Sequence, residues 1–501
     1  MSEHKVFSRE SATIARGAAV NFLTLVAKLG RPLFYLVAAR CYGPSIFGLY
    51  FLAWTYIEIL AGIATLGLEK GLIRFIVYHT SRQEEQEAAD CFRMAILIGS
   101  GLGLILSLAL FFLADHIAPL LHHEAIALPL RWMSLIIFFQ TVSRLLIQAP
   151  MARKVMKYQF YIKGLLEPFL LTGLALLFSY TDLGIKGLCA AHFITMAIVL
   201  LASIFPSFKY FPLRSWFHWP IKFHPEILRF SGSMFLADCI FNFNGRLDVI
   251  LLGTLVSSEV IGVYGIMVQI ANVLPTIRMA FDGIVNPIFT ELHTQEETPR
   301  LSHTYQLTTR WIMLASIPLI VLVALYGRDI AAMAGSAYQM GYPWLLALLL
   351  GTTAVNFFGL AGYLLAMTGH PDTLLSINLI SLIINAVVTY LLAKILGPQG
   401  AALGVSLVFI VTQTLYVRAV SRRLKIHPFQ INLWKPLLSG LITAGVLITI
   451  HSFRITTPLG NLLVHVPLVF ILYGATLIGL GLEPEERRLG ISLCKKMGWG
   501  P

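Results

Sequence analysis

The sequence predicts an all-α polytopic membrane protein with about 14 transmembrane helices, and three observations support this prediction. Of the 501 residues, 57% are hydrophobic and only 12% are charged, whereas a soluble domain carries roughly 25% charged residues. Apolar runs of about 20 residues, long enough to cross the hydrocarbon core of a bilayer, recur along the whole chain. Lys and Arg gather in alternate connecting segments. A water-soluble protein is therefore excluded.

The expected spans are 16–39, 45–68, 91–113, 126–148, 159–180, 184–205, 230–252, 260–283, 309–327, 341–367, 372–395, 399–419, 434–452 and 462–481. Most of the 37 Lys and Arg residues then lie on the side of the membrane that holds the amino terminus. By the positive-inside rule both termini of this multi-pass membrane protein are expected in the cytoplasm. The net charge of +12 follows largely from this topology, so we expect no nucleic-acid partner.

Short matches at an offset of about 214 residues indicate an internal duplication. Ile46 to Tyr50 (Ile-Phe-Gly-Leu-Tyr) matches Val260 to Tyr264 (Val-Ile-Gly-Val-Tyr), and the Gly-Arg pair at Arg31 matches the one at Arg246. Leu183 to Gly187 similarly matches Leu396 to Gly400. An even number of spans separates the copies, so the repeat axis should lie along the membrane normal.

The duplication predicts two six-helix lobes followed by two further helices. The expected parts are an N-lobe at 1–205, a cytoplasmic linker at 206–229, a C-lobe at 230–419, two additional spans within 434–481 and a cytoplasmic tail at 482–501.

A polar stripe marks the first span. Asn21, Thr24, Lys28, Arg31 and Tyr35 follow one another at spacings of three or four residues, which places them on one helical face. Cations at membrane depth are expensive and seldom face lipid. One interpretation is that Lys28 and Arg31 bind phosphate in a central cavity. The alternative is a structural ion pair with a carboxylate of the second or seventh span.

The seventh span carries Asp238, Asn242 and Arg246 at spacings of four residues, again on one face, with Asp248 off that face. Arg246 is the repeat counterpart of Arg31, so we predict that it lines the same cavity. The alternative is that Asp238 and Arg246 neutralise each other through their neighbours.

Glu58, in the middle of the second span, has two interpretations: a proton or sodium carrier, or the counter-charge of Lys28. Gln269 and Asn272 of the eighth span are also expected to line the cavity. A second group of polar residues has a weaker prediction of a direct role and comprises Arg144, Glu167, Arg278, Asp282 and Asn356.

Signatures of catalysis and metal binding are absent from the sequence. It contains no His-Glu-x-x-His, Gly-x-Ser-x-Gly or P-loop motif, and its five cysteines are scattered without a Cys-x-x-Cys pair. We therefore expect neither an enzyme nor a metal site, and no cofactor. Coupling to H+ or Na+ stays an open alternative.

Two stretches of the first 80 residues resemble a known family. These are AARCYGPSIFGLYFLA at 38–53 and LAGIATLGLEKGLIRF at 60–75, with Arg16-Gly17 before them. They resemble bacterial polysaccharide transporters, the lipid-linked oligosaccharide (O-antigen, Wzx-type) flippases of the multidrug/oligosaccharidyl-lipid/polysaccharide (MOP) exporter superfamily. The resemblance implies two lobes around a central cavity and alternating access between the two faces of the membrane.

The resemblance also implies a cargo and its partners. The cargo would be an oligosaccharide on undecaprenyl-pyrophosphate, moved to the periplasmic leaflet for lipopolysaccharide or other surface polysaccharide, with Lys28, Arg31 and Arg246 meeting the pyrophosphate. Membrane lipids and other polysaccharide-assembly membrane proteins would be partners. Two alternatives within the superfamily are a peptidoglycan-precursor (lipid II type) flippase and a cation-coupled multidrug antiporter.

Overall fold

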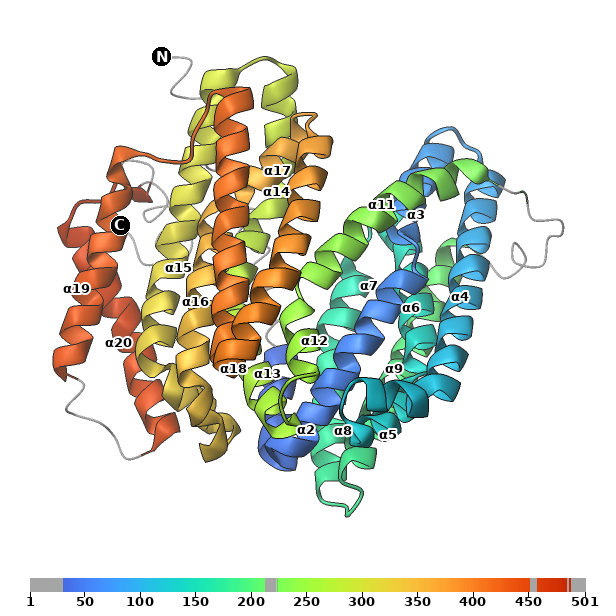
Figure 1. Cartoon of the computed structure of the whole chain (residues 1–501). Helices are drawn as coiled ribbons and strands as arrows, with labels where there is room; N and C mark the ends of the chain where they lie inside the picture. Colours follow the sequence, from blue (N-terminus) through green and yellow to red (C-terminus); the bar gives the residue numbers. More distant parts are fainter. Residues whose placement is uncertain (1–29, 212–221, 223, 451–456, 484–485, 488–501) are drawn as a thin grey trace, which may run out of the picture. The chain divides into compact units, whose positions relative to one another are not determined.

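The computed structural model describes residues 30–211, 222, 224–450, 457–483 and 486–487, and every regular element within these ranges is a helix (Figure 1). The predicted all-α membrane fold is confirmed. The chain divides into two compact units. The first unit comprises Ala27–Ile266 and Leu382–Ala401, and the second unit comprises, among described residues, Met267–Ser381 and the residues from Ala402 onward. The predicted division into repeat lobes stays a prediction.

The described chain up to Ala271 forms, in order, α2 (Gly30–Ala64), α3 (Leu68–Ser81), α4 (Glu85–Leu120), η1 (Glu124–Ile126), α5 (Ala127–Met133), α6 (Ile136–Ala152), α7 (Lys157–Gln159), the π-helix η2 (Phe160–Leu166), α8 (Glu167–Ser179), α9 (Ile185–Tyr210), α11 (Pro225–Asn244), α12 (Leu247–Gly253) and α13 (Ser258–Ala271). The remaining helices are α14 (Val273–Thr294), α15 (Thr298–Ala334), η3 (Ser336–Gly341), α16 (Tyr342–Phe358), α17 (Leu360–Met367), α18 (Pro371–Leu424), η4 (Ile431–Leu433), α19 (Trp434–Ile450) and α20 (Pro458–Gly479).

Two of the long helices fold back on themselves. The backbone leaves helical geometry at Gly43 in α2 and at Gly397 in α18, each followed by proline. In α2 the rings of Phe34 and Tyr50 lie 5.9 Å apart, a distance that a straight helix of 1.5 Å rise per residue excludes for residues 16 positions apart. Each of these helices is therefore an antiparallel hairpin of two expected spans.

Nine helical stretches of the described chain are long and apolar enough to cross a membrane, and a tenth follows if the bent pair Glu124–Met133 and Ile136–Ala152 is one span. The expected number of about 14 is larger for physical reasons. Gly30–Ser81 and Pro371–Leu424 each contain a reversal, and Trp434–Ile450 is a shorter apolar helix. The count of 14 itself stays a prediction.

In the first unit, α6 lies at the centre and packs against α2, α3, α4 and α9. A core of aliphatic and aromatic side chains joins α3, α4 and α6, with fully buried Leu72, Phe92 and Leu145 at its middle. Helices α11 and α12 pack against α3 and α2 within the same unit. This packing brings polar side chains from several separate helices to one place.

The matched repeat segments meet directly within the first unit. A Cβ atom on Gly48 would lie 1.7 Å from the Ser258 carbonyl oxygen, and one on Gly262 would lie 2.1 Å from the Pro44 carbonyl oxygen. Only glycine permits such an approach of two backbones. The contact is reciprocal, since Ser258 and Gly262 occupy the repeat positions of Pro44 and Gly48. A two-fold axis between two copies produces this kind of contact.

In the second unit, α15 packs against α14, α16, α19 and α20. One core includes Val285, Phe289 and Tyr305 between α14 and α15, and another includes Leu447 and Val469 under α19 and α20. The start of α20 is fixed locally, because the Thr457 hydroxyl accepts a hydrogen bond of 3.2 Å from the Gly460 backbone N–H.

Candidate functional site

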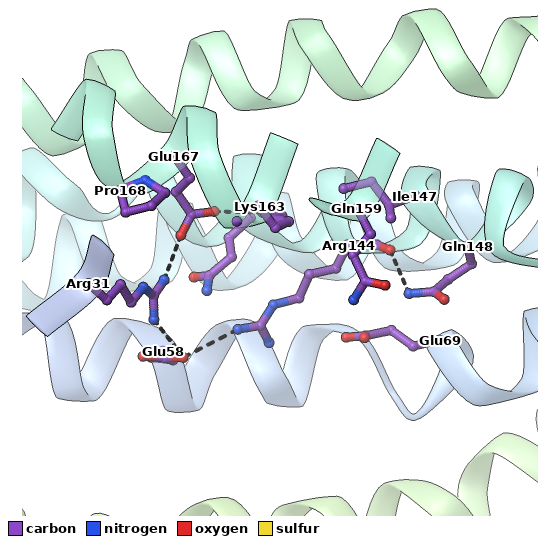
Figure 2. A pocket seen from close by; sticks show the side chains of 12 residues that line it. Arg31, Glu58, Glu69, Arg144, Ile147, Gln148, Gln159, Lys163, Glu167 and Pro168 are labelled. Atoms are coloured by element: carbon purple, nitrogen blue, oxygen red, sulfur yellow. Dashed lines mark hydrogen bonds and ion pairs between the residues drawn. The ribbon is translucent and has the colours of Figure 1, made fainter. Parts of the chain in front are cut away.

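A charged cavity of about 330 Å³ lies wholly within the first unit (Figure 2). Its walls come from α2, α3, α6, α7, η2 and α8. The residues that line it are Arg31, Glu58, Glu69, Gln140, Arg144, Ile147, Gln148, Gln159, Lys163, Gly164, Glu167 and Pro168. Most of these side chains are polar, and such side chains are rarely collected inside an apolar membrane protein unless they have a function.

Glu58 is the meeting point of three arginines. Its carboxylate oxygens lie 3.0 Å from Nη2 of Arg246, 3.4 Å from Nη2 of Arg144 and 3.9 Å from Nη1 of Arg31. The Glu58 side chain is only 12% exposed. Arg31 and Arg246, which were predicted to line one cavity, therefore share a carboxylate. Glu58 itself is not an isolated carboxyl group but a common counter-charge.

Glu167 forms the second carboxylate centre. It accepts a hydrogen bond of 2.6 Å from Nη2 of Arg31 and lies 3.1 Å from Nζ of Lys163. Lys163 also donates to the Ser143 hydroxyl at 3.0 Å. Lys163 belongs to the π-helix η2, which ends directly before Glu167. Single π-turns inside α-helical stretches are frequent at functional sites.

A close helix contact places Arg31 beside Glu167. A Cβ atom on Gly30 would lie 2.8 Å from the ring of Pro168, so α2 and α8 approach each other at this point because residue 30 has no side chain. The Arg31 guanidinium also lies over the Trp54 ring at 5.4 Å, a favourable cation–π position. Arg31 thus joins both carboxylate centres and keeps 37% of its side chain exposed.

Arg246 reaches the site from a break in the helix. α11 ends at Asn244 and α12 begins at Leu247, so Gly245 and Arg246 form the connection between them. The Asn385 side-chain amide, from the part of α18 that belongs to the first unit, donates to the Asn244 side-chain oxygen at 2.7 Å. This hydrogen bond holds the backbone directly before Gly245 and Arg246 in place.

Cations outnumber carboxylates in this cluster. Among the described residues, Arg31, Arg144, Lys163 and Arg246 contribute four positive charges, and Glu58 and Glu167 contribute two negative ones. Arg246 belongs to this ion-pair cluster but not to the cavity wall, where Arg31, Arg144 and Lys163 are matched by Glu58, Glu69 and Glu167. Removing charges from water is costly unless they are paired, so an excess cation favours an anion from outside. Guanidinium groups suit phosphate because they can bind it bidentately.

The other predicted residues of the first unit lie around this cluster. Tyr35 is buried and packs with the rings of Phe34, Phe47 and Phe51. Asp238 pairs with Lys70 at 2.5 Å.

Asn242 lies beside α2, since its Nδ2 atom would be 3.4 Å from a Cβ atom on Gly62. None of Tyr35, Asp238 and Asn242 lines the cavity, and Arg246 is not part of its wall either but contacts the lining residue Glu58.

Some predicted residues fall elsewhere. Asn21, Thr24 and Lys28 lie outside the described residues. Gln269 and Asn272 belong to the second unit.

Arg278, Asp282 and Asn356 also belong to the second unit. Arg278 pairs with Asp282 at 3.0 Å, and its backbone N–H donates to Asn356 at 3.3 Å.

Sequence reasoning missed several cavity residues, above all Lys163. The available signal was a lysine four residues before Glu167 inside an apolar span, a spacing that puts both charges on one helical face. Gln140, Gln148 and Gln159 carry no such signal, because a lone glutamine in an apolar span has many possible partners. Gln140 is 2% exposed, and its side-chain oxygen has no hydrogen-bond partner among described groups.

Comparison with known proteins gives the family. The sequence matches the model of the family described as polysaccharide biosynthesis protein over residues 37–343, more than half of the 501 residues. The chain belongs to this family. The resemblance predicted from the opening residues is confirmed.

A relative described as a probable flippase matches part of this chain. It is the probable flippase AglR of Haloferax volcanii, 26% identical over 242 residues, which cover 47% of this chain and 49% of the relative. The chain thus spans about half the length of the curated relative that it matches.

Solved structures establish the fold. The lipid II flippase MurJ in its inward closed conformation has a TM-score of 0.73 at 14% identity, covering 95% of this chain and 99% of MurJ. An inward-facing multidrug resistance MATE family transporter of the MOP superfamily has a TM-score of 0.68 at 13% identity, covering 80% of this chain and 98% of that chain. A MOP superfamily transporter from Pyrococcus furiosus has a TM-score of 0.61 at 12% identity, covering 84% and 96% respectively. This polysaccharide biosynthesis protein therefore has the fold of these transporters.

Proposed function

We propose that this protein is a flippase that moves an oligosaccharide linked to undecaprenyl-pyrophosphate from the cytoplasmic to the periplasmic leaflet of the bacterial inner membrane. The observation that carries the proposal is the convergence of three arginines, Arg31, Arg144 and Arg246, on the Glu58 carboxylate beside the cavity. Membership of the polysaccharide biosynthesis protein family and the partial match to a probable flippase support it.

The cavity supplies what a pyrophosphate head group needs in order to leave water. Burying an unpaired charge in hydrocarbon costs many kcal/mol. Arg31, Arg144 and Arg246 already point at one carboxylate, so their donors are positioned before any cargo arrives. Such preorganisation reduces the entropy lost on binding. In our proposal the pyrophosphate takes over these donors from Glu58.

The glycan and the lipid tail have separate environments in this scheme. Sugar hydroxyls need hydrogen-bond partners when they leave water, and Gln140, Gln148 and Gln159 offer amide groups along the cavity wall. The long apolar tail can stay in the bilayer throughout. The cargo crosses unmodified by alternating access, with no bond made or broken. Coupling to H+ or Na+ is one possible source of energy for this transport.

One alternative has specific support. A lipid II type flippase would use the same pyrophosphate chemistry, and the fold likeness to MurJ extends over 95% of this chain. A multidrug antiporter for cationic compounds is disfavoured, because the one carboxylate at the centre of the cluster, Glu58, is already surrounded by three arginines. The oligosaccharide flippase and the lipid II type flippase would differ in the glycan that they carry and not in the pyrophosphate that they bind.

Flipping of a fluorescent polyprenyl-pyrophosphate oligosaccharide in proteoliposomes tests the proposal. Arg31→Ala and Arg246→Ala should each reduce the initial rate to background, because each removes a donor for the pyrophosphate. The matched control is Arg131→Ala, which removes a surface arginine paired with Asp115 outside the cavity. Rates equal to wild type in both cavity variants would refute the anion role of this site.

A comparison of cargoes sharpens the test. A lipid II analogue and the oligosaccharide lipid should be presented at equal concentration to the same proteoliposomes. Preference for the oligosaccharide lipid supports the proposal, and preference for the lipid II analogue supports the alternative. Export of a cationic dye in place of both lipids would refute both.

A further inference from the structure

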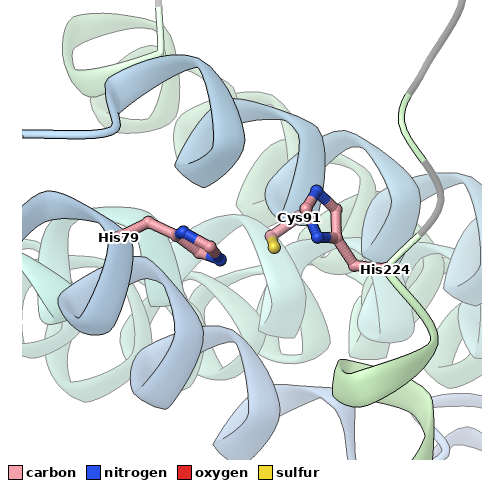
Figure 3. A group of neighbouring side chains, drawn as sticks. All are labelled: His79, Cys91 and His224. Atoms are coloured by element: carbon pink, nitrogen blue, oxygen red, sulfur yellow. The ribbon is translucent and has the colours of Figure 1, made fainter. Parts of the chain in front are cut away.

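A second group of side chains, none of which lines the cavity, consists of His79, Cys91 and His224 in the first unit (Figure 3). One ligand atom from each of the three lies within 4.8 Å of the others. His79 lies near the end of α3, Cys91 in the second turn of α4, and His224 directly before α11. The prediction of no metal site rested on scattered cysteines without a Cys-x-x-Cys pair, whereas the structure brings these three distant residues together.

We propose that His79, Cys91, His224 and Glu87 form a structural zinc site. Thiolate, imidazole and carboxylate are the ligands that Zn²⁺ takes in tetrahedral sites with four protein ligands. Closed sites of this type hold separate chain segments together. The zinc would join α3, α4 and the start of α11.

The His79 ring has the orientation that is usual for a histidine bound to zinc. Nδ1 of His79 lies 2.7 Å from a carboxylate oxygen of Glu84, which leaves Nε2 for a metal. Zinc-binding histidines commonly donate their second ring nitrogen to such a carboxylate, which fixes the tautomer and the orientation of the ring. In Figure 3 the His79 ring points toward the Cys91 sulfur. Cys91 is fully buried, so its sulfur is shielded from solvent.

Glu87 supplies the fourth ligand from the same helix as Cys91. The two residues are four apart on α4 and therefore share a face. One Glu87 oxygen accepts from Nζ of Lys222 at 2.5 Å, and the other lies 3.1 Å from Nε2 of His224. That second oxygen and that nitrogen are both buried without a hydrogen bond.

The distance between these two atoms is the geometric observation that brings Glu87 into the site. Two atoms bound to one zinc at roughly 2.0–2.1 Å in tetrahedral geometry lie a little over 3 Å apart. The separation of 3.1 Å matches that geometry.

Metal analysis of the purified full chain tests the site, using an affinity tag without histidine. We expect about one zinc ion per chain after dialysis. Cys91→Ser should lower the bound zinc to the background level. Cys189→Ser is the matched control, because Cys189 is also a buried cysteine of the first unit and lies in α9 away from this group.

Cobalt substitution identifies the ligands directly. Co²⁺ bound to a thiolate gives a near-ultraviolet charge-transfer band, which wild type and Cys189→Ser should show and Cys91→Ser should lack. Glu84→Gln should keep the band and weaken metal affinity about ten-fold, as loss of an outer-shell partner does. If Cys91→Ser does not fold, His224→Ala replaces it, with bound zinc as the readout. Wild-type protein without zinc and without a cobalt band would overturn the proposal.

Discussion

Two groups of buried charges, one in each compact unit, use the same residue types and differ in balance. In the second unit, Arg310 pairs with Glu486 at 2.6 Å and lies 3.8 Å from Glu483, while Lys435 pairs with Glu483 at 2.8 Å. Among described residues this group holds two cations and two carboxylates, and the Arg310 side chain is 2% exposed. A group of this kind, balanced in charge around the buried pair Arg310–Glu486, is structural.

The cavity group of the first unit has more cations than carboxylates and remains open to solvent. The side chains of Arg31, Arg144 and Arg246 are 37%, 25% and 29% exposed. The difference teaches that buried ion pairs alone do not indicate a binding site in a membrane protein. Unequal charge and residual access to solvent are the informative features.

The largest loss of stability is expected when the balanced group around Arg310 is broken. Arg310→Met leaves Glu486 buried without its partner, and breaking a buried pair costs about 3–5 kcal/mol. Thermal unfolding in detergent should show a large loss of stability. Arg144→Met is the comparison, since it removes only the 3.4 Å contact to Glu58, which keeps two other arginines. An equal loss of stability in the two variants would contradict the distinction.

The next effect concerns the contact between α2 and α8. Gly30→Ala places a methyl group against the Pro168 ring, where a Cβ atom has only 2.8 Å. Overpacking of this kind costs about 1–3 kcal/mol. Because the same contact sets the distance from Arg31 to Glu167, flipping should fall together with stability. Gly101→Ala on α4, where nothing lies within 4 Å, is the control and should be silent.

A smaller effect tests Glu58 as the counter-charge of the cavity. Glu58→Gln removes one negative charge that three arginines share, so inorganic pyrophosphate should bind more tightly, by roughly 1 kcal/mol for a partly solvated charge. Isothermal titration of the detergent-solubilised protein measures this. Cargo release should become slower in the flipping assay. Weaker pyrophosphate binding would show that Glu58 orders the arginines and does not compete with the anion.

The smallest effect is expected at the membrane surface. Arg131 pairs with Asp115, and both side chains are exposed, by 41% and 59%. Exposed pairs contribute about 0–1 kcal/mol. Arg131→Ala should therefore leave thermal stability and flipping within experimental error of wild type. A marked loss of either would mean that charge at this surface matters as much as charge in the cavity.

Much of the fold could be predicted from the sequence, because apolar runs of membrane-spanning length admit few structures besides helices. The reversal at Gly43 lies at the boundary expected between the first two spans, 16–39 and 45–68. The break at Gly245 and Arg246 lay inside the span predicted at 230–252, since hydropathy does not register two residues without helical geometry. The prediction for Arg31 and Arg246 rested on their repeat positions, and both reach Glu58.

The remaining cavity residues depend on contacts that a sequence pattern does not contain. Arg144 and Glu167 were only in the second group of candidates, because the helices that bring them to Glu58 and Arg31, respectively, are far apart in the chain. Lys163 acquires its place from a π-helix, whose occurrence within an apolar run has no clear composition signal. Asp238, in contrast, shares a helical face with Arg246 but pairs with Lys70 of α3.

The hairpin formed by α2 couples two of the charges mechanically. Rings of its two arms pack together at Phe34 with Tyr50 and at Tyr35 with Phe51. Arg31 and Glu58 lie on opposite arms of this hairpin, while Glu167 belongs to α8. Any movement of the hairpin relative to α8 would therefore keep Arg31 with Glu58 and would have to break the 2.6 Å pair between Arg31 and Glu167.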